Sequence, residues 1–192
     1  MRTKSFERET VLKQAVYIFW RQGYDGTSMS TLVNEMGINR QSMYDTFGDK
    51  HQLFLLALQA YYEMTKTEIK TKLTSAADLE DALRTIFNVY AHHADTAPAG
   101  CLIVNSATEL GAVDSEVGQL IGQYFKSEKV GLTEVLRQFQ SELLPDVDLS
   151  VLAAILHNAL VGVRVQSRIN NQLIDAVIND TIQSLPWKEG KS

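Results

Sequence analysis

Residues 27–54 read TSMSTLVNEMGINRQSMYDTFGDKHQLF and predict two short helices around a tight turn, followed by the start of a third helix. Leu32, Val33 and Met36 give the first of these helices an apolar face at helical spacing. Gly37 stands where the chain must turn sharply, because glycine adopts a positive φ without a Cβ clash. The stretch therefore predicts a helix-turn-helix.

The second short helix predicts an inner and an outer face. Asn39 is a favourable N-cap, and Met43 and Phe47, four residues apart, point inward. The outer face then carries Arg40, Gln41, Tyr44 and Asp45. An arginine and a glutamine in the first turn suit the major groove of DNA, where Arg reads guanine and Gln reads adenine. Many helical proteins, however, contain a comparable hairpin for packing alone.

The order of residues around the hairpin makes the pattern more specific. A helix ends at Gly23-Tyr24, Thr27-Ser28 precede the next helix, and Tyr44-x-x-Phe47 and Lys50-x-x-Leu53 follow. This layout resembles the amino-terminal domain of the TetR family of bacterial transcriptional regulators. The resemblance is strong over residues 1 to about 55 and extends to the rest of the chain only in its helical architecture. It implies a regulator that binds double-stranded operator DNA.

The hairpin and the resemblance together assign the expected DNA contacts. In the family, the threonine and lysine that match Thr27 and Lys50 contact phosphates, and Thr27 and Ser28 would also cap a helix. The expected set is Thr27, Ser28, Asn39, Arg40, Gln41, Tyr44 and Lys50. Asp45 departs from the family pattern, because an acidic group near phosphates costs binding unless it accepts from cytosine or pairs with Arg40.

Composition favours an all-α protein with two parts. The 192 residues are 45% apolar and 21% charged, with three prolines and few strand-like alternations. We expect a three-helix DNA-binding domain over residues 1–50 and a larger helical effector-binding and dimerisation domain over residues 51–192. The net charge is −5, divided as +1 in the first part and −6 in the second. DNA contact would then depend on placed side chains and not on a broad basic surface.

Cellular location follows from what the sequence contains. One cysteine excludes an internal disulfide framework, and no apolar run at the start suggests a signal peptide. The most apolar segment, residues 149–165, is short for a membrane span and is interrupted by polar residues. We expect a cytoplasmic protein without a membrane partner.

Helical spacing and turn residues predict the remaining elements. Residues 1–6 are expected to form a loose arm, and the helices are expected at about 7–22, 50–72, 79 to before Pro98, 101–110, 115–144, 149–169 and 171–185. The helix from Lys50 would join the DNA-reading unit rigidly to the rest of the chain. It is therefore the expected transmission element.

The last two helices predict a homodimer. The helix at 149–169 is apolar almost all round, and the helix at 171–185 has an apolar stripe that includes Ile178. This is more apolar surface than one subunit obviously buries. In TetR-like regulators the matching helices pair with their copies as a four-helix bundle, which implies the same arrangement here.

An effector pocket is expected behind residues 101–110. Asn105 and Glu109, one turn apart, add polar groups to a short apolar helix, and a pocket needs mostly apolar walls with a few polar groups. The expected lining is Phe87, Tyr90, Cys101, Asn105, Glu109, Phe125 and His157. A carboxylate in this wall would favour a cationic or hydrogen-bond-donating ligand. The same Asn–Glu pair also fits a surface face or a helix cap.

Two residues of this lining and a pair of adjacent histidines carry competing interpretations. The segment around Cys101 resembles one in a TetR-like subgroup, some of whose members sense electrophiles through a cysteine, although most single cysteines are buried hydrophobes. His157 fits a hydrogen-bonded core or interface histidine. His92 and His93 with Asp95 do not form a trusted metal-ligand spacing. We expect no metal, no cofactor and no catalytic set.

The sequence thus predicts a ligand-responsive transcriptional regulator, with repression as the expected mode. Two other classes remain open. One is a small helical enzyme that uses Glu109 or His157, which would leave Arg40, Gln41 and Lys50 without a purpose. The other is a helical interaction protein whose hairpin only packs, which would show no salt-dependent affinity for DNA.

Overall fold

The computed structural model describes residues 2–92, 97–169 and 172–190. The described residues form nine α-helices and one 3-10 turn, with no sheet, which confirms the all-α prediction. The bounds are α1 Arg2–Gln22, α2 Met29–Glu35, α3 Arg40–Phe47, α4 Lys50–Leu73, α5 Leu79–Ala91, α6 Leu102–Glu109, α7 Ser115–Gln138, η1 Gln140–Glu142, α8 Leu149–Ile169 and α9 Ile174–Gln183.

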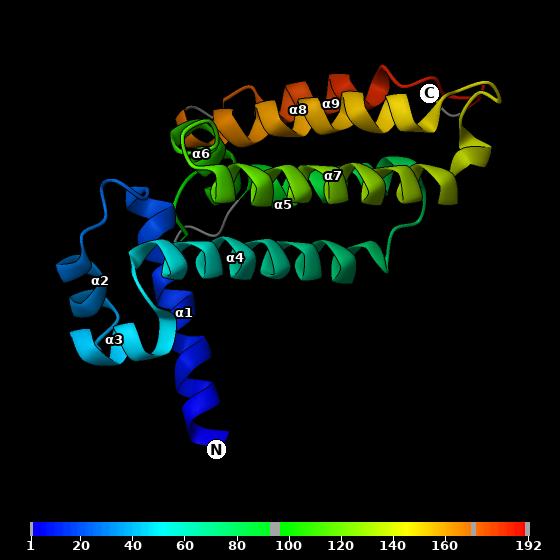
Figure 1. The fold of residues 1–192 in the computed structure, drawn as a ribbon. Helices are drawn as coiled ribbons and strands as arrows, with labels where there is room; N and C mark the ends of the chain where they lie inside the picture. Colours follow the sequence, from blue (N-terminus) through cyan, green and yellow to red (C-terminus); the bar gives the residue numbers. More distant parts are fainter. Residues whose placement is uncertain (1, 93–96, 170–171, 191–192) are drawn as a thin grey trace.

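The helices form a small head and a layered body. Figure 1 shows α1, α2 and α3 grouped at one end, with α4 leading away from them along the body. Helices α5 and α7 form the next layer, and α8 and α9 lie on the far side. Helix α6 is short and lies at the end of the body nearest the head. The body can therefore act on the head through α4 and α6.

Four boundaries differ from the sequence-based expectation. Helix α5 ends at Ala91 and not just before Pro98, because His92 adopts an extended backbone. Helix α1 begins at Arg2, so residues 2–6 continue the helix and do not form a loose arm. Helix α7 ends at Gln138, because the following backbone pairs with the carboxyl-terminal segment: the Leu144 amide donates to the Pro186 carbonyl at 2.9 Å. Helix α9 begins at Ile174, and residue 171, where it was expected to begin, lies outside the described residues.

Two apolar clusters form the core, and one of them crosses from the head into the body. It contains the buried side chains of α1 to α3, the first half of α4, and much of α6 and the start of α7. In it the rings of Phe19 and Phe54 meet edge to face at 5.0 Å, and those of Trp20 and Tyr61 at 4.9 Å. Each buried ring contributes about 1.5–3 kcal/mol. The expected domain boundary at residue 50 therefore divides the chain but not the core, because one apolar cluster contains residues from both sides of it.

The second cluster lies among α5, the second half of α7, α8 and α9. Among the described residues, α8 is the one helix long and apolar enough to cross a membrane. It is nevertheless part of this fold, because Leu156 and Leu160 are buried in the cluster. His157 and Arg164 on the same helix are also buried and form ion pairs with α7. Its apolar character is explained by packing.

Candidate DNA interface and effector cavity

The hairpin of α2 and α3 has the predicted geometry. Gly37 has a φ of +65°, and its amide donates to the Asn34 carbonyl at 3.3 Å. Leu32 on α2 and Met43 and Phe47 on α3 are buried, so both short helices lie against the core of the head. Glycine is required at the turn because a side chain there would be strained.

Side-chain caps fix where both short helices begin. The Ser28 hydroxyl accepts from the Thr31 amide at 3.0 Å, and the Asn39 side chain accepts from the Ser42 amide at 2.8 Å. A cap of this kind is worth about 1 kcal/mol. Asn39 therefore sets the start, and with it the orientation, of α3.

The outer face of α3 is exposed. The Arg40 guanidinium lies 5.9 Å from the centre of the Tyr44 ring. The Gln41 amide donates to the Asp45 carboxylate at 2.9 Å, so Asp45 pairs with Gln41 and not with Arg40. This pairing engages one carboxylate oxygen in the face that a groove of DNA would meet.

Lys50 and Thr27 differ in their access to a phosphate. Lys50 is the first residue of α4, and its ammonium lies 4.1 Å from the centre of the Tyr24 ring, at the edge of the head. Thr27 is only 1% exposed, and its hydroxyl donates to the Gly23 carbonyl at 2.6 Å. The Thr27 side chain is therefore engaged inside the head.

Glu109 binds the backbone of the head and does not line the cavity between α4, α5, α7 and α8 that is described below. Its carboxylate accepts from the amides of Tyr24 at 3.1 Å and Asp25 at 2.9 Å. Gly23, with a φ of +74°, permits this approach, since a Cβ there would lie 2.9 Å from a carboxylate oxygen. The expected role of Glu109 as a ligand contact does not fit this geometry.

A second bond ties the other end of α6 to α1. The Trp20 indole donates to the Gly100 carbonyl, just before α6, at 2.9 Å in a buried environment. The segment just before α6 is thus bonded to α1, and the last residue of α6 is bonded to the loop between α1 and α2. The sequence did not predict this junction, because partners 80 or more residues apart leave no local signal.

The other expected effector residues do not gather around one cavity. Phe87 and Cys101 are buried in the core. The Asn105 amide nitrogen is buried without a partner among the described residues. Phe125 lies 5.1 Å from the His157 ring, edge to face. Among the seven expected residues, Tyr90 alone lines the hollow between α4, α5, α7 and α8 that is described next.

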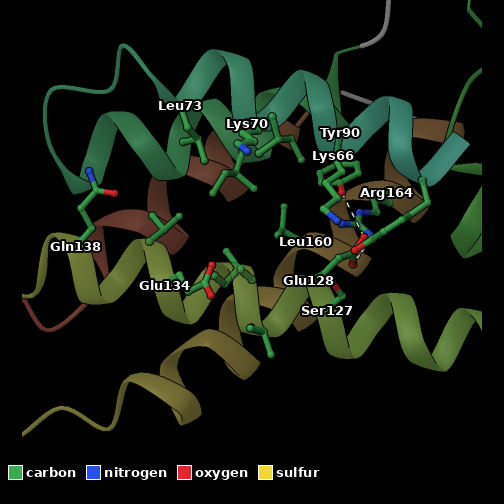
Figure 2. A pocket seen from close by; sticks show the side chains of 17 residues that line it. Lys66, Lys70, Leu73, Tyr90, Ser127, Glu128, Glu134, Gln138, Leu160 and Arg164 are labelled. Atoms are coloured by element: carbon green, nitrogen blue, oxygen red, sulfur yellow. Dashed lines mark hydrogen bonds and ion pairs between the residues drawn. The ribbon is translucent and has the colours of Figure 1, made fainter. Parts of the chain in front are cut away.

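That hollow lies between α4, α5, α7 and α8 and has a volume of about 560 Å³. Figure 2 shows side chains from these helices around it, with Leu73 and Gln138 toward one end and Tyr90, Glu128 and Arg164 at the other. Its size is within the range of small-molecule sites. We refer to it below as the α4–α7 cavity.

A buried charge cluster closes one end of the cavity. Glu128 on α7 accepts from His157 at 3.0 Å, from Arg164 at 3.0 and 3.2 Å, and from the Tyr90 hydroxyl at 3.3 Å. Burial by itself raises the pKa of Glu128, but the bonds from His157 and Arg164 outweigh it and hold the pKa below its ordinary value. Glu128 is therefore ionised at neutral pH.

Burial and the neighbouring charges also set the other members of the cluster. Burial raises the pKa of Tyr90 far above its ordinary value despite the nearby arginine, so its hydroxyl stays protonated and donates. Burial lowers the pKa of Arg164, but Tyr90, Cys101 and Glu128 together raise it above its ordinary value. Arg164 is one of the polar residues that interrupt the apolar segment 149–165, and its place in the sequence did not predict this partner.

The outer faces of α8 and α9 leave a set of large apolar side chains exposed: Val151, Ile155, Val165, Ile169, Leu173 and Val177. Ile178, by contrast, is 2% exposed and belongs to the core of the subunit. A charge at Ile178 would therefore unfold the chain before it affected an interface.

Within the described residues, no three His, Cys, Asp or Glu side chains are close enough to hold a metal ion. His92 pairs with Asp175 at 2.8 Å on the surface. His93 and Asp95 lie outside the described residues. The partner of His92 is therefore the Asp175 carboxylate.

A helix-turn-helix head with an exposed second helix, held on an all-helical body with an internal cavity, defines a class of DNA-binding transcriptional regulators. Known proteins agree with this class. The family described as "Bacterial regulatory proteins, tetR family" matches residues 11–57. The chain is 35% identical over 167 residues to the uncharacterized HTH-type transcriptional regulator YezE of Bacillus subtilis (strain 168), covering 82% of this chain and 84% of YezE.

Other relatives extend the comparison. The chain is 27% identical over 172 residues to the HTH-type transcriptional repressor ComR of Escherichia coli (strain K12), covering 87% of this chain and 82% of ComR. Among solved structures, a cysteine mutant of the TetR family transcriptional regulator CifR, complexed with 26-bp double-strand operator DNA, is similar with a TM-score of 0.82 and 26% identity over 93% of this chain and 96% of that one. The chain belongs to the TetR family. It is a DNA-binding transcriptional regulator and not an enzyme.

Proposed function

We propose that this regulator is a repressor that binds its operator as a homodimer and releases it when a small molecule enters the α4–α7 cavity. The observation that carries this proposal is that α4 both lines the cavity and holds the head. A molecule that binds better to one position of α4 than to another shifts the population of head positions. The repressor named ComR supports the sign of regulation, and a regulator of this kind acts in the cytoplasm.

The DNA contacts belong to this proposal. Arg40 and Gln41 would read base edges from the exposed face of α3. Ser28, Tyr44 and Lys50 would hold phosphates around it. Asn39 would contribute by fixing the start of α3, and Thr27 by supporting the loop before α2. The operator complex of CifR supports a double-stranded DNA partner.

The dimer would form through α8 and α9. Their outer faces carry the exposed apolar side chains named above, which is the kind of surface that a second copy covers. Two heads held at a fixed spacing would then match two half-sites of a near-palindromic operator.

A gel-shift titration against the chain's own upstream intergenic DNA tests this function. We expect a discrete, salt-dependent complex that competitor DNA of unrelated sequence displaces poorly. A chain that only packs its hairpin would show no such complex. Adding small-molecule fractions from the source cell should then release the operator, and an operator complex that no fraction releases would contradict the ligand-responsive part.

A further inference from the structure

The charge cluster of the α4–α7 cavity is satisfied on its acidic side. Each carboxylate oxygen of Glu128 accepts two bonds: Oε1 from Tyr90 and Arg164, and Oε2 from His157 and Arg164. An ionised carboxylate that accepts four hydrogen bonds has little capacity left for another. Glu128 therefore does not call for a cationic ligand.

The basic side of the cluster is not satisfied. Arg164 is 1% exposed and uses only Nη1, which bonds both oxygens of Glu128. Its Nε and Nη2 atoms are buried and have no partner among the described residues. The face of the guanidinium packs on the Tyr90 ring at 3.5 Å, so that ring holds its plane in place.

The two unpaired nitrogens belong to one edge of the guanidinium. The Nε–Nη2 edge presents two parallel N–H groups, the geometry that binds a carboxylate through both of its oxygens. Leaving buried charged donors unpaired is costly, and an acceptor placed there recovers that cost. A ligand that binds at this end of the cavity would therefore pair these nitrogens if it carried a hydrogen-bond acceptor.

The rim of the cavity favours the same sign of charge. Lys66 and Lys70, one turn apart on α4, both line it, and Figure 2 shows both on the α4 side of the space. Glu134 on α7 is the one other acidic residue of the lining besides Glu128. With Glu128 neutralised by Arg164, the remaining lining carries two lysines against one glutamate.

The rest of the wall suits a hydrocarbon body. Ile69 and Leu73 on α4, Ile86 on α5, and Leu132 and Val135 on α7 also line the cavity, and Figure 2 shows Leu73 toward the end away from the cluster. A site with an apolar wall and a few convergent polar groups at one end selects amphiphilic molecules.

We propose that the effector is a small organic acid whose carboxylate binds at Arg164 and Lys66 and whose apolar body lies along the wall of α4, α5 and α7. This proposal rests on the proposed function and names the ligand class of its cavity. It reverses the sign of the ligand charge that Glu109 had suggested from the sequence.

The same arrangement links binding to movement. The unpaired nitrogens of Arg164 are covered by protein atoms, so a carboxylate reaches them only when neighbouring side chains shift. Lys66 lies on α4, the helix that carries the head. An acid that draws Lys66 toward Arg164 binds the shifted position of α4 more tightly, which is the differential affinity that release from DNA requires.

The test compares matched probes that differ only in the charge of the head group. Benzoate, phenylacetate, 4-phenylbutyrate and decanoate are each compared with the corresponding amide and amine at equal ionic strength. The midpoint of thermal unfolding and calorimetric titration report binding to the wild-type chain. We expect at least one acid to bind about tenfold or more tightly than its amide, since hydrogen bonds to charged groups are the stronger ones, and its amine not to bind.

Variants place the acid in the cavity. Lys66→Met should weaken the acid several-fold and leave the amide unchanged, while Lys126→Met, on α7 outside the lining, should change neither. The paired variant Glu128→Met/Arg164→Met removes both charges together, so neither is left buried alone. It should fold and lose the preference for the acid.

Several outcomes overturn the proposal. They are equal binding of acid and amide, preference for an amine, binding that survives the paired variant unchanged, or no binding by any acid of the series. None of these measurements uses DNA. Failure of the wild-type chain to bind its operator would instead contradict the proposed function, and the two failures are therefore distinguishable.

Discussion

At the scale of single residues, the head contains side chains that bond its own backbone and side chains that are exposed to solvent. Thr27 and Asn39 form hydrogen bonds with the backbone: the Thr27 hydroxyl donates to the Gly23 carbonyl, and the Asn39 side chain accepts from the Ser42 amide. Arg40 and Gln41 are exposed, and Lys50 extends over the Tyr24 ring at the edge of the head. Substitution of the first group should act through stability, and substitution of the second group through DNA affinity.

Lys50 and Gln41 should differ in kind. Lys50→Ala should weaken operator and unrelated DNA alike and lower the slope of log affinity against log salt by about one unit, because one phosphate contact is lost. Gln41→Ala should relax preference at one base pair by roughly 1–3 kcal/mol. Binding titrations on both DNAs at several salt concentrations measure the two effects, and equal losses on all sequences from both variants would refute the assignment.

Asp45, which accepts a hydrogen bond from Gln41, places a negative charge on the same face of α3. Asp45→Asn removes a negative charge from the face of α3 while keeping its shape, so we expect tighter binding to operator and unrelated DNA at low salt. This gain should fade as salt rises. Weaker binding would mean that Asp45 itself accepts from a base.

Glu128 should make the body sensitive to acid. The pKa of Glu128 in the folded chain lies below its ordinary value of 4.5. The stabilisation is therefore complete above about pH 4.5 and is lost as the pH falls through the folded pKa, since the unfolded chain takes up the proton first. Urea unfolding at a series of pH values should show this loss in the wild-type chain and a smaller one in Glu128→Met/Arg164→Met. Identical dependence of stability on pH in the two proteins would contradict this role of Glu128.

At the scale of elements, α6 is a second connection between body and head besides α4. Its carboxyl-terminal residue, Glu109, binds the amides of Tyr24 and Asp25, and Gly100 before it binds Trp20. A shift of α6 therefore moves the loop between α1 and α2 directly. The sequence had predicted only the helix from Lys50, α4, as the transmission element.

Glu109→Ala should loosen this connection. Two backbone amides lose a charged acceptor, worth about 1.5–3 kcal/mol for hydrogen bonds of this kind, and less where solvent replaces it. We expect weaker operator binding without effector, with the helical content of the chain unchanged. Gly23→Ala should produce the same defect from the other side, because its Cβ would meet the carboxylate. Wild-type operator affinity in both variants would limit α6 to a packing role.

At the scale of the whole molecule, α8 and α9, which carry the exposed apolar side chains, lie on the side of the body away from α4 (Figure 1). A dimer formed there would leave α4 and the heads of both subunits uncovered for DNA. The cavity would lie between the interface and α4. Ligand binding could then change the spacing of the heads while the dimer remains intact.

Ile155→Asp should dissociate the dimer. Ile155 is 57% exposed within the subunit, so the charge costs little in a monomer and is buried only against a second copy. Light scattering should show a folded monomer, with operator affinity falling because two half-sites are no longer bound together. Val113→Asp, at a residue 81% exposed between α6 and α7, is the matched control and should leave the dimer unchanged. An intact dimer in Ile155→Asp would place the interface elsewhere.

The sequence by itself determined the parts of this protein that depend on neighbours along the chain. Helix spacing, the caps Ser28 and Asn39 and the turn at Gly37 act over a few residues, so the helix-turn-helix and most helices were predictable. The apolar excess of α8 and α9 was also visible. These signals are local, and no partner from elsewhere in the chain competes with them.

Only the tertiary structure decided what the polar groups of the body bind. Glu109 meets Tyr24 across 85 residues, and Arg164 meets Glu128 across 36, so no spacing in the sequence announces either contact. The end of α7 was decided in the same way, by pairing of the Leu144 amide with the Pro186 carbonyl. A buried charge takes the partner that packing brings to it, because leaving it unpaired costs more than any local preference.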